Sequence, residues 1–306
     1  MPRYLNVAAV CLCLAAAVGC PGCGQPAGPS SYTAKTYFRS DVAGDPVIVL
    51  RIVQGYDAGD FFAKRNVVEL AEAAQTGRLT RVSELVGRGV NPNARGYQGI
   101  TPLIYAMSGI TLNGFRRLLE LGADPNLQME NGDSVMTLTA ACRDPEALKL
   151  AIAFRGNPNL RIPFKLAFHD FWPTPLFVTV VQNRLENARI LIKAGADMNA
   201  RSFDGKTALM EAASQGRYEM MYVLLEAGAD PRARNNKGDM ASYDLLDRVP
   251  PAPSSDTAKW RQRCMEFMAR NGIDFEKERA RYAEIHRGVN AGRNSRNVTA
   301  SQKAQK

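Results

Sequence analysis

Histidine is scarce in this 306-residue sequence, which contains two. His169 and His286 lie far apart, so they form no pair at metal-ligand spacing. Cys142 and Cys264 also stand alone, without the nearby partner that a redox or zinc motif requires. We therefore expect neither a bound metal nor a cofactor.

Other catalytic signatures are missing as well. Gly87-Arg88-Gly89 leads into Val-Asn-Pro instead of a lysine-bearing helix, so it is not a phosphate-binding loop. The sequence has no G-x-S-x-G nucleophile turn. It also lacks the run of about 18 apolar residues that a membrane-spanning helix needs. These absences predict a protein that is not an enzyme.

Charge is unevenly distributed along the chain. The net charge is +9, but residues 276–306 carry eight basic and three acidic residues, so this tail supplies 8 − 3 = +5. The body is therefore only mildly basic, which argues against nucleic acid as a partner. The tail fits a solvated, disordered terminus better than a contact with anionic lipid or glycan.

Four of the six cysteines crowd the N-terminus at Cys11, Cys13, Cys20 and Cys23. An apolar run from Leu5 to Val18 has the length of a signal-peptide core, and it ends in Ala17-Val18-Gly19-Cys20. We predict a signal peptide at 1–19 and a flexible Pro, Gly and Ser-rich tether at 20–31. Cys20 and Cys23 form a CxxC, but without the flanking strand and helix of a redox centre.

This N-terminal segment resembles the lipobox of bacterial lipoproteins. The resemblance implies that Cys20 is lipidated and becomes the mature N-terminus, although Ala17 stands where the family prefers leucine. Pro21 replaces the aspartate that signals inner-membrane retention in enterobacteria, which implies the periplasmic face of the outer membrane. Ordinary secretion after cleavage near Gly19 and a retained N-terminal anchor are the alternatives.

An internal repeat dominates the rest of the chain. Similar glycine-led motifs recur at intervals of 33, 34, 39, 33 and 44 residues, starting at Gly89, Gly122, Gly156, Gly195, Gly228 and Gly272. Threonine stands 21 residues before three of these glycines, at Thr101, Thr174 and Thr207. Small residues stand 16 before five of them, at Ala73, Ala106, Ala140, Thr179 and Ala212. Such a double register predicts a repeat architecture.

The residue types in this register predict helix pairs. Threonine is a good N-cap, and proline is tolerated at the first helical position. Gly122, Gly195 and Gly228 follow apolar segments and suit the left-handed residue that ends a helix. One such pair cannot bury its apolar face alone, so we expect neighbouring pairs to stack.

Thr101-Pro102-Leu103, Thr174-Pro175-Leu176 and the Gly-Ala-Asp-Pro-Asn motif at Gly122 resemble the ankyrin repeat. The resemblance implies an all-α solenoid of about five to six repeats with turn or β-hairpin fingers. We expect an N-terminal cap at 32–65, in which Pro46–Val53 reads as a strand or a helix. The expected repeats are 66–98, 99–132, 133–172, 173–205, 206–238 and a degenerate cap at 239–275, followed by a helix and basic disordered tail at 276–306.

The same resemblance implies a monomer that binds a protein through the finger tips and the first helices, which form the concave face. The residues predicted to contact the partner are Tyr97, Tyr105, Phe203, Glu211, Arg217 and Tyr218. Phe168 and Trp172, in an insertion of the third repeat, are further candidates. The alternatives are ordinary solvated residues and an insertion that folds back over the next repeat.

The predicted lipoprotein signal peptide and the predicted fold together indicate a non-enzymatic, protein-binding lipoprotein of the bacterial envelope. One hypothesis is an immunity protein that neutralises a secreted toxin. A second is an envelope stress or assembly factor that protects an envelope enzyme. A secreted host-directed effector and an enzyme with a site around His169 are further alternatives.

Overall fold

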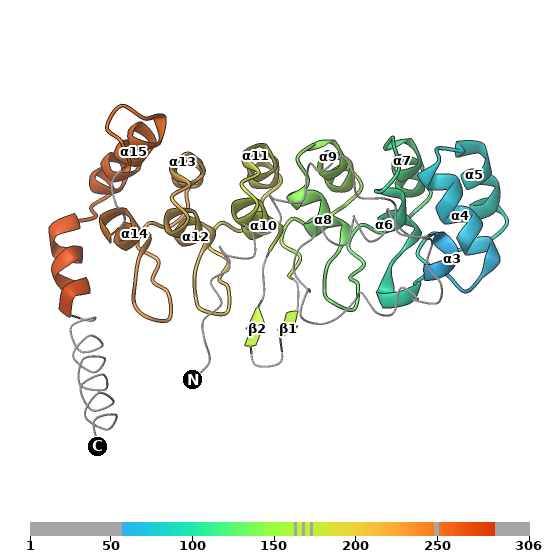
Figure 1. Ribbon diagram of the computed structural model, residues 1–306, viewed down its shortest axis with the longest axis horizontal. Helices are drawn as coiled ribbons and strands as arrows, with labels where there is room; N and C mark the ends of the chain where they lie inside the picture. Colours follow the sequence, from blue (N-terminus) through green and yellow to red (C-terminus); the bar gives the residue numbers. More distant parts are fainter. Residues whose placement is uncertain (1–56, 162–163, 167–168, 172–173, 248–250, 285–306) are drawn as a thin grey trace, which may run out of the picture. The chain divides into compact units, whose positions relative to one another are not determined.

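The computed structural model describes residues 57–161, 164–166, 169–171, 174–247 and 251–284. The predicted signal peptide, the tether, the Pro46–Val53 segment, Phe168, Trp172 and the tail beyond residue 284 lie outside these ranges. Successive helix pairs lie side by side in one row (Figure 1). The pairs are α4 (Arg65–Gln75) with α5 (Leu79–Gly87), α6 (Pro102–Ala106) with α7 (Asn113–Glu120), α8 (Val135–Ala141) with α9 (Glu146–Ala153), α10 (Pro175–Val181) with α11 (Leu185–Lys193), α12 (Ala208–Ser214) with α13 (Tyr218–Glu226), and α14 (Ala241–Asp247) with α15 (Asp256–Arg270).

The core runs between neighbouring pairs. First helices pack on first helices, as α10 does on α8 and α12, and second helices pack likewise, as α5 does on α7. Leucines from successive helices are buried in this core, namely Leu103, Leu118, Leu176, Leu191, Leu209 and Leu224. Burial of apolar surface contributes about 25 cal/mol per Å² to the free energy of folding, so each repeat is stabilised by the repeats that pack against it.

The predicted helix boundaries follow from local chemistry. The Thr101, Thr174 and Thr207 hydroxyls each accept a hydrogen bond from the backbone N–H three residues on, which caps α6, α10 and α12. Gly122 and Gly228 end their helices with φ of 89° and 95°. Residues with a side chain rarely adopt this left-handed region.

The third repeat departs from the predicted register by one residue. The N-cap of α8 is Ser134, and the left-handed residue after α9 is Arg155, with φ of 65°. Gly156 therefore takes the place that alanine has in other repeats, and aligning it with Gly122 and Gly195 was wrong. A Cβ at Gly156 would collide with Met136, so glycine is needed there for packing instead of for its φ.

The lengthened part of the third repeat forms a small sheet. Strands β1 (Phe164–Leu166) and β2 (His169–Phe171) pair antiparallel, with Phe164 opposite Phe171 and Leu166 opposite His169. This hairpin projects from the row of helices (Figure 1), as a β-hairpin finger of the predicted all-α solenoid would. Because Phe168 and Trp172 lie outside the described residues, their binding or covering role stays a prediction.

Asparagine side chains link successive repeats. Each occupies the place four residues after the left-handed residue and accepts a backbone N–H of the next repeat. The bonds are Asp124 N to Asn93 (2.8 Å), Asn157 N to Asn126 (2.6 Å), Asp197 N to Asn159 (2.7 Å) and Asp230 N to Asn199 (2.9 Å). In the fifth repeat this place belongs to Arg232, whose guanidinium donates to the Asn271 carbonyl.

Both ends of the described row carry extra helical segments. The short helix α3 (Ala58–Phe61) packs on α4. Residues 275–284 are helical, and they return to the last turn between repeats. There the Glu278 carboxylate pairs with Arg234 at 3.0 Å, and Tyr282 stacks on Tyr243 of α14 with 3.5 Å between ring centroids. These contacts cover the end of the row.

Candidate protein-binding surface

We call the segments that join successive helix pairs fingers; they cover 90–101, 123–134, 156–174, 196–207 and 229–240. Phe203 lies at the tip of the fourth finger, with 48% of its surface exposed. The Ser202 hydroxyl binds the Asp204 carboxylate at 2.5 Å, and the Ser202 N–H donates to the Lys206 carbonyl at 2.9 Å. The finger tip is thus a tightly hydrogen-bonded turn that presents an aromatic ring to solvent.

The fifth finger holds this tip from the side. The Asn236 amide donates to the Phe203 carbonyl at 2.9 Å, and the Asn236 N–H donates to the Asp204 carbonyl at 3.0 Å. A Cβ at Gly205 would collide with the Asn236 side chain, so glycine permits this close approach. An anchor whose backbone is already fixed loses little entropy on binding, which favours Phe203 as a contact residue.

Long polar side chains tie neighbouring fingers together. Arg95 donates to the Gln128 carbonyl at 2.9 Å, Gln128 to the Arg161 carbonyl at 2.6 Å, and Arg201 to the Arg234 carbonyl at 2.5 Å. The sequence shows these residues near finger tips but not that they bond to each other. These bonds hold neighbouring fingers in place, and the Arg201 bond links the fourth finger, which carries Phe203, to the fifth.

Tyr97 lies on the first finger, in the short 3-10 turn η3 (Tyr97–Gly99). Its side chain is half-buried and packs partly against the core. Tyr97 and Phe203 are on the first and fourth fingers, so the structure does not bring them to one point. A partner contact at Tyr97 stays a prediction.

Tyr105 is not a surface residue, contrary to the prediction. It is 3% exposed, and its ring meets Phe61 and Phe62 edge-on, with centroids 6.0 and 6.3 Å away. The cause is α3, which brings both phenylalanines onto α6. Burial raises the pKa of the Tyr105 hydroxyl to about 12. Tyr105 therefore belongs to the core.

Tyr218 is likewise buried, at 4% exposure, and the prediction of a surface contact was wrong. It is the first residue of α13, a second helix, and not part of a first helix. α15 packs over this end, and the Cys264 thiol donates to the Tyr218 carbonyl at 3.2 Å. An alanine at Tyr105 or Tyr218 would therefore report on folding and not on partner binding.

Glu211 and Arg217 are half-buried and have partners within the chain. The Glu211 carboxylate accepts from Gln215 at 2.5 Å and pairs with Lys206 at 3.4 Å. The Arg217 guanidinium donates to the Val180 carbonyl. Arg184 makes the same contact one repeat earlier, to the Ala141 carbonyl at 2.7 Å. Arg217 therefore joins adjacent repeats, whatever else it contacts.

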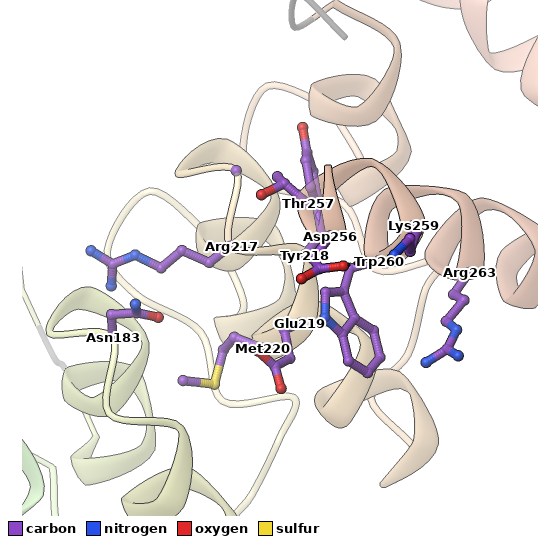
Figure 2. A pocket seen from close by; sticks show the side chains of 11 residues that line it. Asn183, Arg217, Tyr218, Glu219, Met220, Asp256, Thr257, Lys259, Trp260 and Arg263 are labelled. Carbon is purple, nitrogen blue, oxygen red and sulfur yellow. Dashed lines mark hydrogen bonds and ion pairs between the residues drawn. The ribbon is translucent and has the colours of Figure 1, made fainter. Parts of the chain in front are cut away.

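A groove of about 590 Å³ opens between the first turns of α13 and α15, away from the fingers. Arg217, Met220 and Trp260 are among its lining residues, and Trp260 stands in the middle of it (Figure 2). The Arg263 guanidinium lies 4.7 Å from the Trp260 ring centroid. The opening arises where the unit containing α15 is longer than the other repeats.

Reactive groups are few in the described ranges. They contain no cluster of three or more His, Cys, Asp and Glu residues that could hold a metal ion. Burial raises the pKa of the Cys264 thiol to about 12 and also raises that of Cys142. Both thiols are therefore protonated at neutral pH, whereas a nucleophilic cysteine needs a lowered pKa. None of the described helices combines the length and apolar character needed to cross a bilayer.

A family model described as ankyrin repeats, in three copies, matches residues 136–235. The helix pairs have the fold of ankyrin repeats. Two solved structures share the fold: an ankyrin repeat domain from Acinetobacter baumannii AYE (21% identity, covering 65% of this chain and 96% of that one, TM-score 0.53) and that of Bcl-3, a member of the IkappaB family (23% identity, 67% and 86%, TM-score 0.53).

Curated relatives align with part of the ankyrin array. An ankyrin repeat-containing protein of Treponema pallidum (strain Nichols) is 32% identical over 117 residues, covering 34% of this chain and 39% of that protein. Protein PhlB of Serratia liquefaciens is 31% identical over 119 residues, covering 39% and 50%. The chain thus spans half or less of the length of these relatives. The fold is typically a protein-interaction scaffold without catalytic function, and no catalytic family is indicated.

Proposed function

We propose that this ankyrin array binds a protein through its fingers, with Phe203 as the main anchor. The exposed, doubly braced position of Phe203 is the observation that carries the proposal. Aromatic anchors dominate binding energies because they bury a large area at a low entropic cost.

The charges near Phe203 favour a protein over a polyanion. Arg201 and Lys237 are exposed there, and Asp204 is exposed beside them. A nucleic-acid surface would gather cations without interspersed acids. Mixed charge around an aromatic centre is instead the usual anatomy of a protein interface rim.

We further propose that Cys20 carries the lipid anchor and that the array faces the periplasm from the outer membrane. The Ala17-Val18-Gly19-Cys20 segment supports this address. The partner is then an envelope or imported protein. A secreted toxin neutralised by the array is the first candidate, and an envelope enzyme that the array protects is the second. A secreted host-directed effector would require release from the membrane.

A photo-crosslinking amino acid at position 203 tests the interface in the native cell. We expect one discrete adduct from Phe203 and none from Arg189, an exposed residue on the second helix α11. Identifying the adduct separates the candidates, since a toxin, an envelope enzyme and a host protein are different proteins. Absence of any adduct at position 203 would remove the proposal.

Labelling with a palmitate analogue tests the address separately. The wild-type chain should incorporate the label, and the Cys20→Ser variant should not. Equal labelling of the two chains, or none in either, would contradict the lipid anchor at Cys20. It would leave the proposed binding through the fingers unaffected.

A further inference from the structure

Two exposed apolar side chains lie on neighbouring turns, away from the fingers. Among the described residues, the large apolar side chains that remain exposed are Leu79, Ile110 and Phe203. Leu79 is 39% exposed, and Ile110 is 102% exposed. Both follow the first helix of a pair, in the first and second repeats respectively. Protruding apolar residues that gather in one place mark contact surfaces.

Ile110 occupies a place where three other repeats have a left-handed residue. Gly77, Asn183 and Gly216 stand at the equivalent position with φ of 72°, 53° and 69°. Isoleucine is β-branched and avoids that region. The turn accordingly takes another form, in which the Gly109 N–H donates to the Ala106 carbonyl at 3.1 Å. A residue that breaks the local rule of its repeat is a candidate for function.

The turn that carries Ile110 is held firmly by the preceding repeat. The Gln75 amide donates to the Ser108 hydroxyl at 2.8 Å, and Ser108 donates to the Tyr105 carbonyl at 2.7 Å. A Cβ at Gly109 would collide with the Gln75 carbonyl, so the backbones approach closely. Ile110 therefore projects from a fixed support.

The charged residue on the two turns is an arginine. Residues 75–80 and 108–113, which form the two turns, contain Arg78 and no acidic residue. A Cβ at Gly77 would lie 3.8 Å from the Thr111 hydroxyl, which places the turns next to each other. Arg116 is exposed on the first turns of α7. We call Arg78, Leu79, Ile110 and Arg116 the turn patch.

We propose that the turn patch rests on the surface of an anionic phospholipid bilayer. A projecting aliphatic residue enters the interfacial layer, while arginines beside it meet lipid phosphates. The inference rests on the proposed anchor at Cys20, which keeps the array near a membrane. Residues 21–56 separate Cys20 from the described structure and would reach roughly 120 Å if extended. Tethering raises the effective concentration of lipid, so a small patch suffices.

Tryptophan reporters test this contact. The mature acylated chain is reconstituted into vesicles of phosphatidylethanolamine and phosphatidylglycerol, with brominated acyl chains as quenchers. Ile110→Trp should add a tryptophan signal that the bromines quench. Phe203→Trp, at an exposed position on a finger, should add a signal that the bromines do not quench. An unquenched signal at position 110 in a chain that is anchored would overturn the proposal.

Controls separate the patch from the anchor. Absence of acylation in the wild-type chain would refute the anchor alone. The Cys20→Ser chain with Ile110→Trp, given excess phosphatidylglycerol vesicles, would then decide the patch, because quenching supports it and constant emission refutes it. Replacing Arg78 and Arg116 by glutamate should reduce the quenching, and salt should reduce it in the parent. Emission at position 110 that responds to a protein and not to lipid would also refute the proposal.

Discussion

Asn126 holds the repeat that follows it at two points. Its side-chain oxygen accepts the Asn157 N–H at 2.6 Å, and its amide donates to the Arg155 carbonyl at 3.0 Å. One short side chain thus satisfies a donor and an acceptor of the next repeat. Asn93 and Asn159 make the corresponding pair of bonds, which explains why asparagine recurs at this position.

Asn126→Ala should lower the free energy of unfolding by about 1–2 kcal/mol, because both backbone groups lose their partner. Urea unfolding followed by circular dichroism measures the change. Asn66→Ala, at an exposed position on α4, should stay within about 0.5 kcal/mol of the parent. Equal stability of the two variants would show that the asparagine bonds contribute nothing.

Gly114→Ala and Gly122→Ala separate two reasons for glycine. A Cβ at Gly114 would collide with the Ala74 carbonyl, so the change should cost about 1–3 kcal/mol or more by overpacking α4 against α7. Gly122 has open space and a φ of 89°, so its variant should cost about 1 kcal/mol through backbone strain. The reverse order in thermal unfolding would contradict the close helix approach.

Glu278→Gln tests whether the helix at 275–284 is held by its charge pair. Arg234 and Glu278 are partly shielded, so we expect a loss of about 1 kcal/mol and faster amide hydrogen exchange in residues 275–284. Glu276→Gln is the matched control, because its pair with Arg279 is solvent-exposed. Unchanged exchange in the Glu278 variant would mean that the Tyr243–Tyr282 stack is sufficient.

Alkaline pH should destabilise the array through Tyr105. Its pKa is raised from an ordinary 10 to about 12 in the folded protein. The folded state therefore keeps its proton longer than the unfolded chain, and stability is complete below about pH 10 and declines toward pH 12. Tyr105→Phe should flatten this decline in unfolding titrations, although Cys264 contributes in the same direction. Identical slopes would contradict a buried hydroxyl.

Leu119→Ala should cost about 2–5 kcal/mol, because a buried leucine leaves a cavity that its neighbours cannot fill. Leu79→Ala removes the same atoms from a partly exposed position and should cost less. Chemical denaturation compares the two. A larger loss for Leu79 would place the core elsewhere.

The stack of helix pairs could be predicted from sequence because its signals are local. Thr174 and Thr207 cap helices through bonds within three residues, and Gly195 and Gly228 end them through their own φ. The end of α9 could not be predicted in this way, because Arg155 has a positive φ and arginine is not a residue type that indicates one. The one-residue shift of the third repeat follows from it.

The candidate site was less predictable because burial depends on distant segments. Tyr105 is covered by α3, a helix that the sequence pattern does not define, and Tyr218 by α15. Phe203 stays exposed because a finger tip has no helix over it. The bonds between fingers, such as Arg201 to the Arg234 carbonyl, cross about one repeat length and are invisible in a one-dimensional pattern.

Arg232 affects which end of the array should unfold first under tension. A guanidinium can donate to the Asn271 carbonyl but has no atom that accepts an N–H, so this link to the last helix pair consists of one bond, whereas Asn93, Asn126 and Asn159 each make two. Under tension applied at the two ends, the α14–α15 pair should peel away first while the earlier repeats hold. The protein would then lengthen in a stepwise manner from its C-terminal side.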